Sequence, residues 1–500
     1  MPHSLTLFFA AEEFYEPVTR IFVQFWYVIL VLAVTLFALY AAVHVALNKR
    51  DVRAAIGWIG IIMLVPLVGT ILYFLLGINR IQRRANKVFG SRKRVESNNH
   101  DQWVDENHLV GHLPLDSQHL LSLYRLVQRV SRRPLLSGNK VEPLNGGDAA
   151  YPVMLEAIGK AQGSISLCTY IFDDDPVGRE FLAALKAAKE RGVEVRILVD
   201  AVGARYSYPP IHQTMYEAGL EVEIFNPSRV PWKWAYANLR NHRKLLIVDG
   251  KIGFTGGMNI REGTQLSRNP SHPIQDLHFR IQGPVVAELQ ESFCEDWTFA
   301  TGNTIEGPLW FPPLPPVGNS SCRALSDGPD EDFEHIRWAI LGAIASAERS
   351  VRVITPYFLP DAATISALNV AAMRGLKVEI LVPAHNNLNL VQWASTAHFG
   401  QLLAGGCRIF ETPSPFDHTK LMIVDGAWVM LGSANWDPRS LRLNFELNVE
   451  CYDSELATQL EQLFLEKRQR SHEVTKEENK GRPMSQRVRN GFARLLSPYL

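Results

Sequence analysis

The residues with the clearest capacity for chemistry occur in two copies of one pattern. The first copy runs from Asn241 to Asn259 and the second from Asp417 to Asn435, and the two align without a gap. Each copy reads His-x-Lys, an apolar run, Asp-Gly, a second short apolar run and then Gly-(Gly/Ser)-x-Asn. The repeated polar residues are His242, Lys244, Asp249 and Asn259, matched by His418, Lys420, Asp425 and Asn435. Two intact copies favour a shared functional site over two unrelated surface pairs.

Each copy predicts a strand that turns tightly at Asp-Gly and returns as a second strand. His and Lys lie two residues apart on the first strand, so both point to one face. On the return strand the glycine lets the backbone approach a ligand closely. The asparagine then presents an amide at the same end. One copy therefore gathers an imidazole, an ammonium and an amide, and two copies brought together offer this set twice.

Such a site suits a phosphodiester. One imidazole can attack phosphorus to form a phosphohistidine, while the other protonates the leaving oxygen and later removes a proton from an incoming hydroxyl. The lysines and amides stabilise the phosphoryl oxygens, a task that other enzymes give to metal ions. We expect no metal and no cofactor. Asp249 and Asp425 are included in the candidate catalytic set, although their place at the hairpins favours a turn-stabilising role.

The elements that must position these residues are also duplicated. Residues 184–199 and 367–382 both read as a helix, a glycine stop and a buried strand. Helical periodicity alternating with short β-branched runs predicts βαβ units, and similarity at this long spacing predicts two homologous lobes. The expected fold is α/β, with lobe 1 over 140–305 and lobe 2 over 323–470. The proline-rich stretch 306–322 is interpreted as a stiff connector rather than a ligand for another domain.

Two apolar runs near the start, at about 26–46 and 54–77, each reach the ~20 residues that a helix needs to cross a bilayer. After a tail over 1–20, we therefore predict a two-helix transmembrane hairpin over 21–78. A cleaved signal peptide would instead have a basic start and a single run. Here the first twenty residues carry Glu12, Glu13 and Glu16, and a second run follows at once.

Basic residues dominate the segment over 79–139 where it leaves the second run. Because such clusters stay cytoplasmic, we expect both termini and the lobes on that side. The cluster either sets topology alone or also attracts anionic lipid headgroups. Two further segments have open interpretations as membrane-surface or packing elements. These are Pro231–Tyr236 and the amphipathic tail over 471–500, which either docks on the protein body or lies on the bilayer.

Composition excludes some classes of function. Lys and Arg total 51 and Asp and Glu total 51, so no global basic field for nucleic acid exists. The five cysteines are scattered without CxxC spacing. This pattern argues against a disulfide framework or a zinc knuckle.

The paired motifs resemble those of the phospholipase D superfamily over most of residues 140–465. The resemblance implies that the two lobes form one active site at their interface, with His242 as nucleophile and His418 as general acid and base. Lys244, Lys420 and the two asparagines would hold the phosphate. The family also uses a carboxylate from each lobe to orient the opposite histidine. Glu446 fits that place, and Asp276 is the first-lobe candidate, with Ser433 supporting the site where the first copy has Gly257.

A narrower resemblance is to bacterial cardiolipin synthases, which also join an N-terminal hairpin to two such lobes. It is carried by 55–77, Pro356–Pro360, Asp437–Leu441 and Arg494–Leu500. It implies transfer of a phosphatidyl group from one phosphatidylglycerol to another in the bacterial inner membrane, with the lobes cytoplasmic. The expected partners are membrane lipids and not nucleic acid. Alternatives are a hydrolase or nuclease, transfer to another alcohol, and an inactive membrane scaffold. Synthesis from a CDP-activated lipid is disfavoured, since neither apolar run contains an acidic residue.

Overall fold

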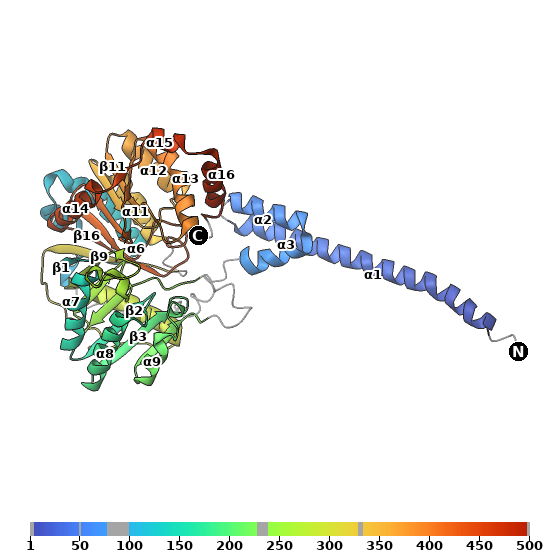
Figure 1. Cartoon of the computed structure of the whole chain (residues 1–500), viewed down its shortest axis with the longest axis horizontal. Coiled ribbons are helices and arrows are strands. Elements are labelled where there is room, and N and C mark those ends of the chain that lie inside the picture. Colours follow the sequence, from blue (N-terminus) through green and yellow to red (C-terminus); the bar gives the residue numbers. More distant parts are fainter. Residues whose placement is uncertain (1–4, 50–51, 78–99, 228–238, 329–333, 498–500) are drawn as a thin grey trace. The chain divides into compact units, whose positions relative to one another are not determined.

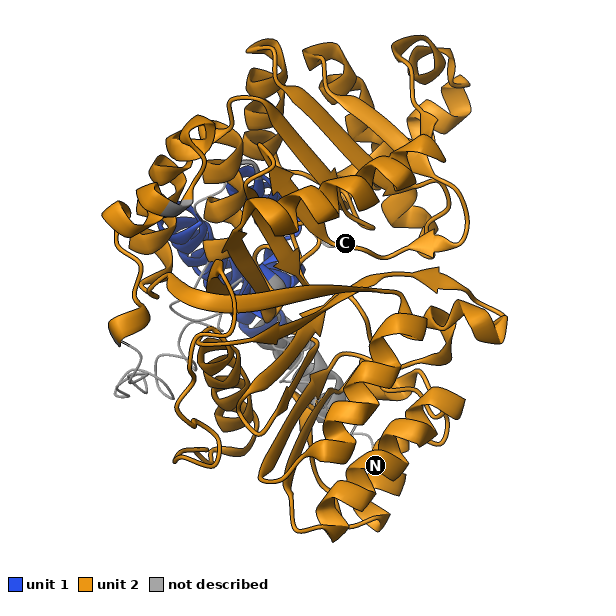
Figure 2. Cartoon of the chain, turned by 90° about the vertical axis from the view of Figure 1, so that its left-hand side faces the viewer, with its two compact units in different colours: residues 1–80, 230–235 blue, residues 81–229, 236–500 orange. Residues whose placement is uncertain are grey.

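The computed structural model describes the chain except for residues 1–4, 50–51, 78–99, 228–238, 329–333 and 498–500. Its contacts divide the chain into two compact units, residues 1–80 with 230–235 and residues 81–229 with 236–500 (Figure 2). Most of the basic cluster after the second apolar run and the aromatic segment Pro231–Tyr236 lie outside the described residues. The predictions made for them therefore stay predictions.

Among the described residues of the first unit, one helix is long and apolar enough to cross a membrane. Helix α1 covers Leu5–Asn48, and its part from Phe22 to Asn48 is long and apolar enough to span a bilayer. The second apolar run is instead broken into α2 (Val52–Leu64), α3 (Pro66–Leu72) and the π-helical turn η1 (Tyr73–Gly77) (Figure 1). The predicted two-helix hairpin, with its second span at about 54–77, is therefore not confirmed. The break follows from Pro66, which has no N–H to donate and whose ring obstructs the preceding turn.

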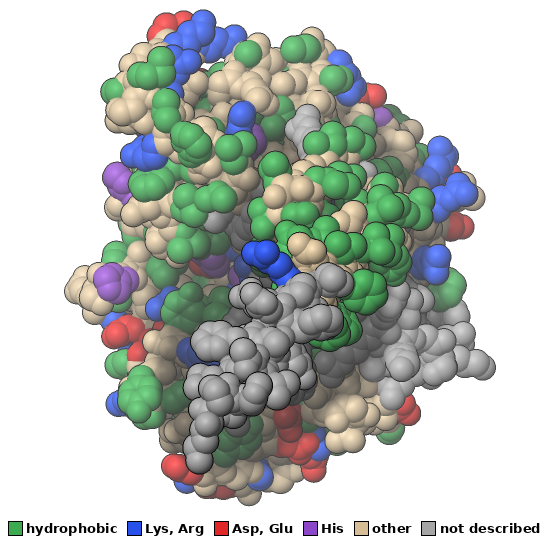
Figure 3. Space-filling view, turned by 90° about the vertical axis from the view of Figure 1, so that its right-hand side faces the viewer, with side chains coloured by type: hydrophobic (Ala, Val, Ile, Leu, Met, Phe, Trp, Pro, Cys, Tyr) green, Lys and Arg blue, Asp and Glu red, His purple; other side chains and the backbone are tan. Residues whose placement is uncertain are grey.

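Helices α2 and α3 fold back on each other. A Cβ built on Gly69 would lie 2.5 Å from the carbonyl oxygen of Ile61, eight residues earlier, so only glycine allows this approach. The rings of Trp58 and Tyr73, near opposite ends of this pair, have centroids 5.5 Å apart. Against the pair packs the last part of α1, where His44 Nδ1 lies 2.8 Å from the Tyr73 hydroxyl. The side of the molecule in Figure 3 carries a broad area of hydrophobic side chains.

In the described part of the second unit, 15 strands form one sheet, in which two similar halves meet at an antiparallel pair of strands. The lobe 1 strands, from this junction outward, are β1 (Leu136–Asn145), β8 (Leu277–Gln282), β6 (Ile252–Gly256), β5 (Leu245–Val248), β2 (Ser164–Thr169), β3 (Glu194–Asp200) and β4 (Glu221–Phe225). The lobe 2 strands are β9 (Ser320–Asp327), β16 (Glu446–Tyr452), β15 (Trp428–Gly432), β14 (Leu421–Val424), β10 (Ser350–Ile354), β11 (Lys377–Pro383), β12 (Arg408–Thr412) and β17 (His472–Glu473). The duplicated α/β architecture is confirmed.

Helices cover both lobes. Lobe 1 has α7 (Gly147–Lys160), α8 (Pro176–Glu190), α9 (Ile211–Glu217), α10 (Val286–Thr301) and the short η4 (Gly203–Arg205), η6 (Glu262–Thr264) and η7 (Leu266–Arg268). Lobe 2 has α11 (His335–Ser346), α12 (Ala362–Met373), α13 (Asn389–Gly405), α14 (Ser454–Gln469), α15 (Lys476–Gly481) and α16 (Met484–Leu495). Ahead of lobe 1 lie η2 (His100–Gln102), α5 (Glu106–His112), η3 (Leu115–Leu120) and α6 (Leu121–Ser131). Leu123 of α6 and Ile340 of α11 share one core, so this segment packs on lobe 2.

The core extends through the junction of the two lobes. Phe279 on β8, Val449 on β16 and Ala324 on β9 belong to one buried cluster. Trp310 and Leu314 of the proline-rich stretch are buried in the same cluster. The connector is therefore packed where the two halves meet, and the halves are held together by a continuous apolar interior rather than by a loose linker.

Candidate active site

Two short backbone pairings carry the histidine of each lobe to the other lobe. Strand β13 (Phe416–Asp417) pairs in parallel with β7 (Ile274–Gln275). The amide of the next residue, His418, donates to the Gln275 carbonyl at 2.7 Å. In the other half Asn241 pairs with Phe445, and the His242 amide donates to the Phe445 carbonyl at 2.9 Å. Because the carboxylate residue follows the carbonyl in each case, these pairings place each histidine beside an acid from the opposite lobe.

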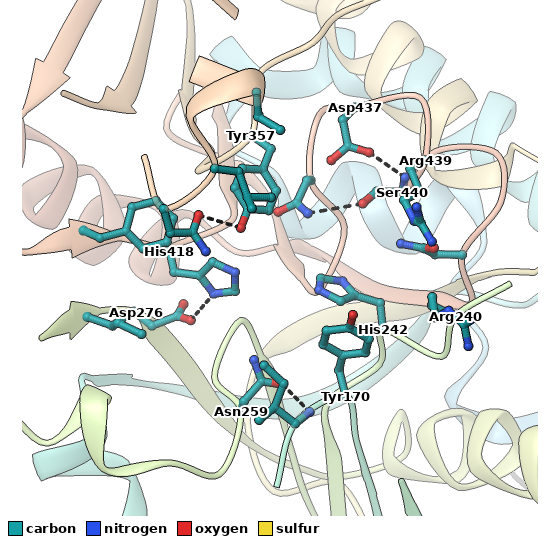
Figure 4. Close-up of a pocket in the computed structure, with 18 of the residues that line it drawn as sticks. Tyr170, Arg240, His242, Asn259, Asp276, Tyr357, His418, Asp437, Arg439 and Ser440 are labelled. Atoms are coloured by element: carbon teal, nitrogen blue, oxygen red, sulfur yellow. Dashed lines mark hydrogen bonds and ion pairs between the residues drawn. The ribbon is translucent and has the colours of Figure 1, made fainter. Parts of the chain in front are cut away.

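The two acids contact the histidines through the same ring nitrogen. His242 Nδ1 lies 3.0 Å from the Glu446 carboxylate, and His418 Nδ1 lies 2.8 Å from that of Asp276. An ionised carboxylate only accepts hydrogen bonds, so it holds the proton on Nδ1 and leaves a lone pair on Nε2. Figure 4 shows both rings pointing into one cavity, with Asp276 joined to the His418 ring by a dashed line. Two imidazoles with available Nε2 atoms therefore face the same space.

The cavity has a volume of about 410 Å³ and is lined by both lobes. Its wall includes the two histidines, the two asparagines and a set of arginines and tyrosines. The main polar lining residues are Tyr170, Tyr206, Arg240, His242, Asn259, Arg261, Thr264, Asp276, Tyr357, Asn387, His418, Asn435, Asp437, Arg439, Ser440 and Asn444. The structure thus brings together residues from both copies of the sequence pattern.

The remaining motif residues lie around this cavity at different depths. Lys244 Nζ donates to the His242 carbonyl and Lys420 Nζ to that of His418, each at 2.6 Å, and neither lysine is among the lining residues. Both are nevertheless buried, so they contribute positive charge from beneath the histidines. Both asparagines line the cavity: Asn259 accepts a hydrogen bond from the Ile171 amide at 3.0 Å, and Asn435 donates one to the Ser440 hydroxyl at 3.3 Å.

Burial sets the protonation of the site. Desolvation lowers the pKa of both His242 and His418 to about 4, and it lowers that of Lys244 to about 7 and that of Lys420 to about 8. Burial alone raises the pKa of the Glu446 and Asp276 carboxyls, but the facing histidines and nearby lysines reverse this and leave both below their ordinary values. At neutral pH the site therefore holds neutral imidazoles, ionised carboxylates and lysines close to losing their protons.

Ser433 contacts the carboxylate behind His242, and the carboxylate beside His418 has no matching serine. Its hydroxyl donates to Glu446 Oε2 at 2.6 Å. At the corresponding position of lobe 1, a Cβ on Gly257 would lie 2.2 Å from Asp276 Oδ1. The shorter aspartate therefore occupies the space that a serine would need.

Asp249 and Asp425 do not line the cavity, and their contacts fit the turn-stabilising role that their hairpin positions favour. They stand at the hairpin turns with φ of 52° and 54°, a conformation in which Asp is tolerated. The Asp249 carboxylate accepts hydrogen bonds from the backbone amides of residues 162–164. The Asp425 carboxylate accepts hydrogen bonds from the backbone amides of residues 348–350. The strands β5 and β14 separate these turns from the histidines. Both aspartates fasten the hairpin to the start of a neighbouring strand.

Several cavity residues were missed by sequence reasoning. The Tyr170 ring lies 5.2 Å from that of His242, and the Tyr357 ring lies 6.2 Å from that of His418. Burial raises the pKa of both tyrosines, so they are neutral donors. Their repeated place at the end of a strand in each copy was the available signal. Arg240 and Arg439 had no such signal, because only the tertiary structure brings the two guanidinium groups to one cavity.

Among the residues that the structure describes, no group of three or more His, Cys, Asp or Glu side chains is placed to hold a metal ion.

Comparisons with known proteins agree with this arrangement. The family model described as "Cardiolipin synthase, PLD-like domain" matches residues 154–297 and 340–468, one match in each lobe. A second model, "Phospholipase D-nuclease N-terminal", matches residues 36–77. The chain is 33% identical over 467 residues to a cardiolipin synthase of Geobacillus sp., covering 92% of each chain. It is also 33% identical over 470 residues to the major cardiolipin synthase of Bacillus subtilis, covering 92% of this chain and 97% of that one.

Among solved structures, the phosphatidylserine synthase of Haemophilus influenzae superposes with a TM-score of 0.60 at 16% identity, covering 76% of this chain and 100% of that chain. This likeness supports the two-lobed fold. Because the family model covers more than half of the chain and the relatives align over nearly all of it, the chain belongs to the cardiolipin synthase family of phospholipase D-like proteins.

Proposed function

We propose that this protein transfers a phosphatidyl group from one phosphatidylglycerol to a second, giving cardiolipin and glycerol. The observation that carries the proposal is that imidazoles from separate lobes, His242 and His418, face one cavity, each held through Nδ1 by a carboxylate of the other lobe. A single base would suffice for activating a hydroxyl. Two are needed where one becomes phosphorylated and the other handles the proton of each alcohol in turn.

In the first step His242 Nε2 attacks phosphorus and forms the N–P bond, and the bond from phosphorus to the oxygen of the headgroup glycerol breaks. His418 gives that oxygen a proton, which it carries only when the bound anionic phosphodiester and Asp276 favour the imidazolium. In the second step the hydroxyl of the acceptor lipid passes its proton to His418 and attacks phosphorus, and His242 is released. One phosphodiester replaces another, so no energy-supplying co-substrate is required.

Positive charge in the cavity suits a reaction in which two anionic lipids meet. Lys244 and Lys420 lie beneath the histidines, where they oppose the charge on the reacting phosphoryl oxygens. Arg240 and Arg439 line the same cavity on the His242 side in Figure 4. Their positive charge lies where it would attract an additional phosphate, which a second phosphatidylglycerol brings and which water or a small alcohol lacks.

The test is to supply purified full-length protein with phosphatidylglycerol bilayers in the presence of a chelator and to identify the products by mass. We expect cardiolipin and glycerol in equal amounts. Predominant phosphatidic acid would mean that water is the acceptor, and the protein would then be a phospholipase D-type hydrolase rather than a synthase.

We also propose that α1 anchors the protein in the bacterial inner membrane with the lobes in the cytoplasm. A single crossing by α1, followed by a returning α2–α3 pair, puts Lys49, Arg50 and Arg53 on the same side as the basic residues after Gly77. Both basic segments are then cytoplasmic, as the distribution of positive charge requires. The acidic N-terminal tail lies on the opposite side, so the expectation that both termini are cytoplasmic is revised.

Single cysteines introduced by Ser4→Cys and Ser485→Cys distinguish these topologies. In intact spheroplasts, a membrane-impermeant maleimide should label position 4 at once and position 485 only after lysis. Protection of both positions until lysis would restore two full crossings.

A further inference from the structure

Helix α16 (Met484–Leu495) packs on the protein through small and polar side chains and exposes its large apolar ones. Its buried residues are Asn490 and Ala493, and Ala493 contacts the core formed with Leu359 and Val391. Its large apolar residues instead point outward, at spacings of three or four that form one stripe. These are Met484, Val488, Phe492 and Leu495, with 69%, 49%, 68% and 66% of their surfaces exposed. A soluble helix buries its large apolar face, so this stripe requires a cover.

The charge of α16 identifies what covers the stripe. Within Met484–Leu495 the charged residues are Arg487, Arg489 and Arg494, and no acidic residue occurs. The Arg489 guanidinium lies 4.4 Å from the centre of the Trp393 ring on α13, at the edge of the apolar stripe. An apolar stripe flanked by arginines and an interfacial tryptophan is the pattern of a helix that lies on an anionic bilayer.

The start of α13 lies between the catalytic cavity and a groove beside α16. The groove has a volume of about 370 Å³ and is lined by Leu390 and Trp393 of α13 together with Phe492 and Leu495. Two residues adjacent in the sequence to Leu390 and to the start of α13 line the catalytic cavity instead. These are Val391 on α13 and Leu388 just before it. The first turns of α13 thus separate an apolar surface groove from the site that binds the headgroup.

We propose that α16 and the first turns of α13 form a bilayer-docking surface for anionic lipid, from which a phospholipid reaches the catalytic cavity headgroup first. This inference rests on the proposed function for the identity of the lipid, but the docking itself does not depend on catalysis. The positive charge favours a lipid surface over a second copy of the chain, because two α16 helices placed face to face would bring six arginines together.

Depth measurements test the docking directly. The full chain carrying Phe492→Cys with a nitroxide label is placed in vesicles of phosphatidylglycerol and phosphatidylethanolamine. Collisions with oxygen should exceed those with a water-soluble nickel complex at position 492. The matched control is Val370→Cys on α12, which is similarly apolar and 55% exposed but lies outside the groove, and it should report water. An aqueous environment at position 492 overturns the proposal, as does a label-to-label distance showing a second copy on the stripe.

Kinetics test the route to the cavity. Phe492→Ser/Leu495→Ser should raise the KM for phosphatidylglycerol in vesicles about tenfold, because two apolar anchors are lost. With a short-chain phosphatidylglycerol dispersed as monomers, kcat and KM should match those of the unsubstituted protein. The control Val370→Ser/Met373→Ser should change neither assay. Equal kinetics in vesicles would overturn the delivery route, whereas absence of cardiolipin with the unsubstituted protein would overturn the proposed function and leave the depth result standing.

Discussion

The two half-sites hold the same imidazole in different ways. His242 is backed by Glu446, which also accepts from the Ser433 hydroxyl at 2.6 Å and from the Asn444 amide at 3.2 Å. His418 is backed by Asp276, which accepts from the Leu277 amide at 2.8 Å. Glu446, the longer acid, is held by side chains, and Asp276, the shorter one, by the backbone amide of the next residue. The distance from carboxylate to Nδ1 is therefore similar in the two half-sites, at 3.0 and 2.8 Å, although different residues set it.

Gly257 shows why the acid and the residue at the serine position depend on each other in each lobe. A serine in lobe 1 at this position would place its Cβ 2.2 Å from Asp276 Oδ1, closer than atoms can approach. Glu446 carries one more methylene, which leaves room for Ser433 in lobe 2. The pairs Asp276 with Gly257 and Glu446 with Ser433 are thus two solutions to the same packing problem, and each works only as a pair.

The largest effects are expected from the histidines, which separate the roles of the half-sites. His242→Ala and His418→Ala should each lower cardiolipin synthesis about 10⁴-fold or more. A phosphatidyl ester of p-nitrophenol, whose leaving group needs no proton, distinguishes them. His418→Ala should release one equivalent of nitrophenol in a burst and then stall, and His242→Ala should give no burst. A burst from His242→Ala alone would reverse the assignment of nucleophile and acid.

Removing the charge of each carboxylate should have the next largest effect. Asp276→Asn and Glu446→Gln keep the shape but weaken the support of the imidazolium, so kcat should fall about 10²- to 10⁴-fold. With the nitrophenyl ester, the burst of Asp276→Asn should recover most of its rate, because His418 is not required as an acid in that step. Glu446→Gln should not recover. Equal recovery by both variants would mean that the half-sites are chemically equivalent.

Exchanging the paired residues tests the packing argument. Gly257→Ser should push Asp276 from His418 and lower kcat about tenfold or more, since the acid loses its alignment. The double change Gly257→Ser/Asp276→Glu rebuilds the lobe 2 arrangement in lobe 1 and should regain part of that loss. Ser433→Gly removes one hydrogen bond from Glu446, worth about 1 kcal/mol, and should reduce kcat by about fivefold. A double variant as slow as Gly257→Ser would show that the two solutions are not interchangeable.

The lysines predict a pH dependence that differs between the lobes. Burial lowers the pKa of Lys244 to about 7 and that of Lys420 to about 8, so their positive charges are present below these values and are lost as the pH rises through them. Affinity for a non-titrating anion such as dimethyl phosphate should therefore weaken above neutral pH, first through Lys244. The measurement is the inhibition constant between pH 6 and 9. Lys244→Gln should shift the weakening to higher pH, and an unchanged profile would contradict this order.

Much of this site could be predicted from sequence, because its chemistry is carried by a local pattern that occurs twice. His242 and Lys244 share a strand face whatever the surroundings, and the ungapped second copy supplied the partner. The pairings of β7 with β13 and of Asn241 with Phe445 could not be predicted, since they join segments more than 100 residues apart. Pro66 is visible in the sequence as a residue that can break a helix, but nothing local reveals the close approach at Gly69.

The smallest effect on activity is expected from the hairpin aspartates, where the comparison concerns stability. Asp249→Asn and Asp425→Asn each weaken three hydrogen bonds from backbone amides, so each should lower the free energy of unfolding by about 1–3 kcal/mol while kcat of the folded protein stays within about twofold. Asp425 also lies 2.6 Å from His119 Nε2, in the segment ahead of lobe 1, whereas the amides of residues 162–164 are the contacts of Asp249. Asp425→Asn should therefore destabilise the protein more.

Thermal unfolding of the full chain, compared with the rate of cardiolipin synthesis well below the transition, separates stability from chemistry for these two variants. His119→Gln is the matched control, because it removes the extra contact of Asp425 and leaves the hairpin amides in place. If the additional loss in Asp425→Asn comes from this contact, the substitution should cost less when His119 is already Gln, and the two hairpins should then be equally sensitive. A large fall in kcat at full folding would instead place the aspartates in the catalytic set, since a residue that only fastens a turn, one strand away from the histidine, has no means of slowing phosphoryl transfer.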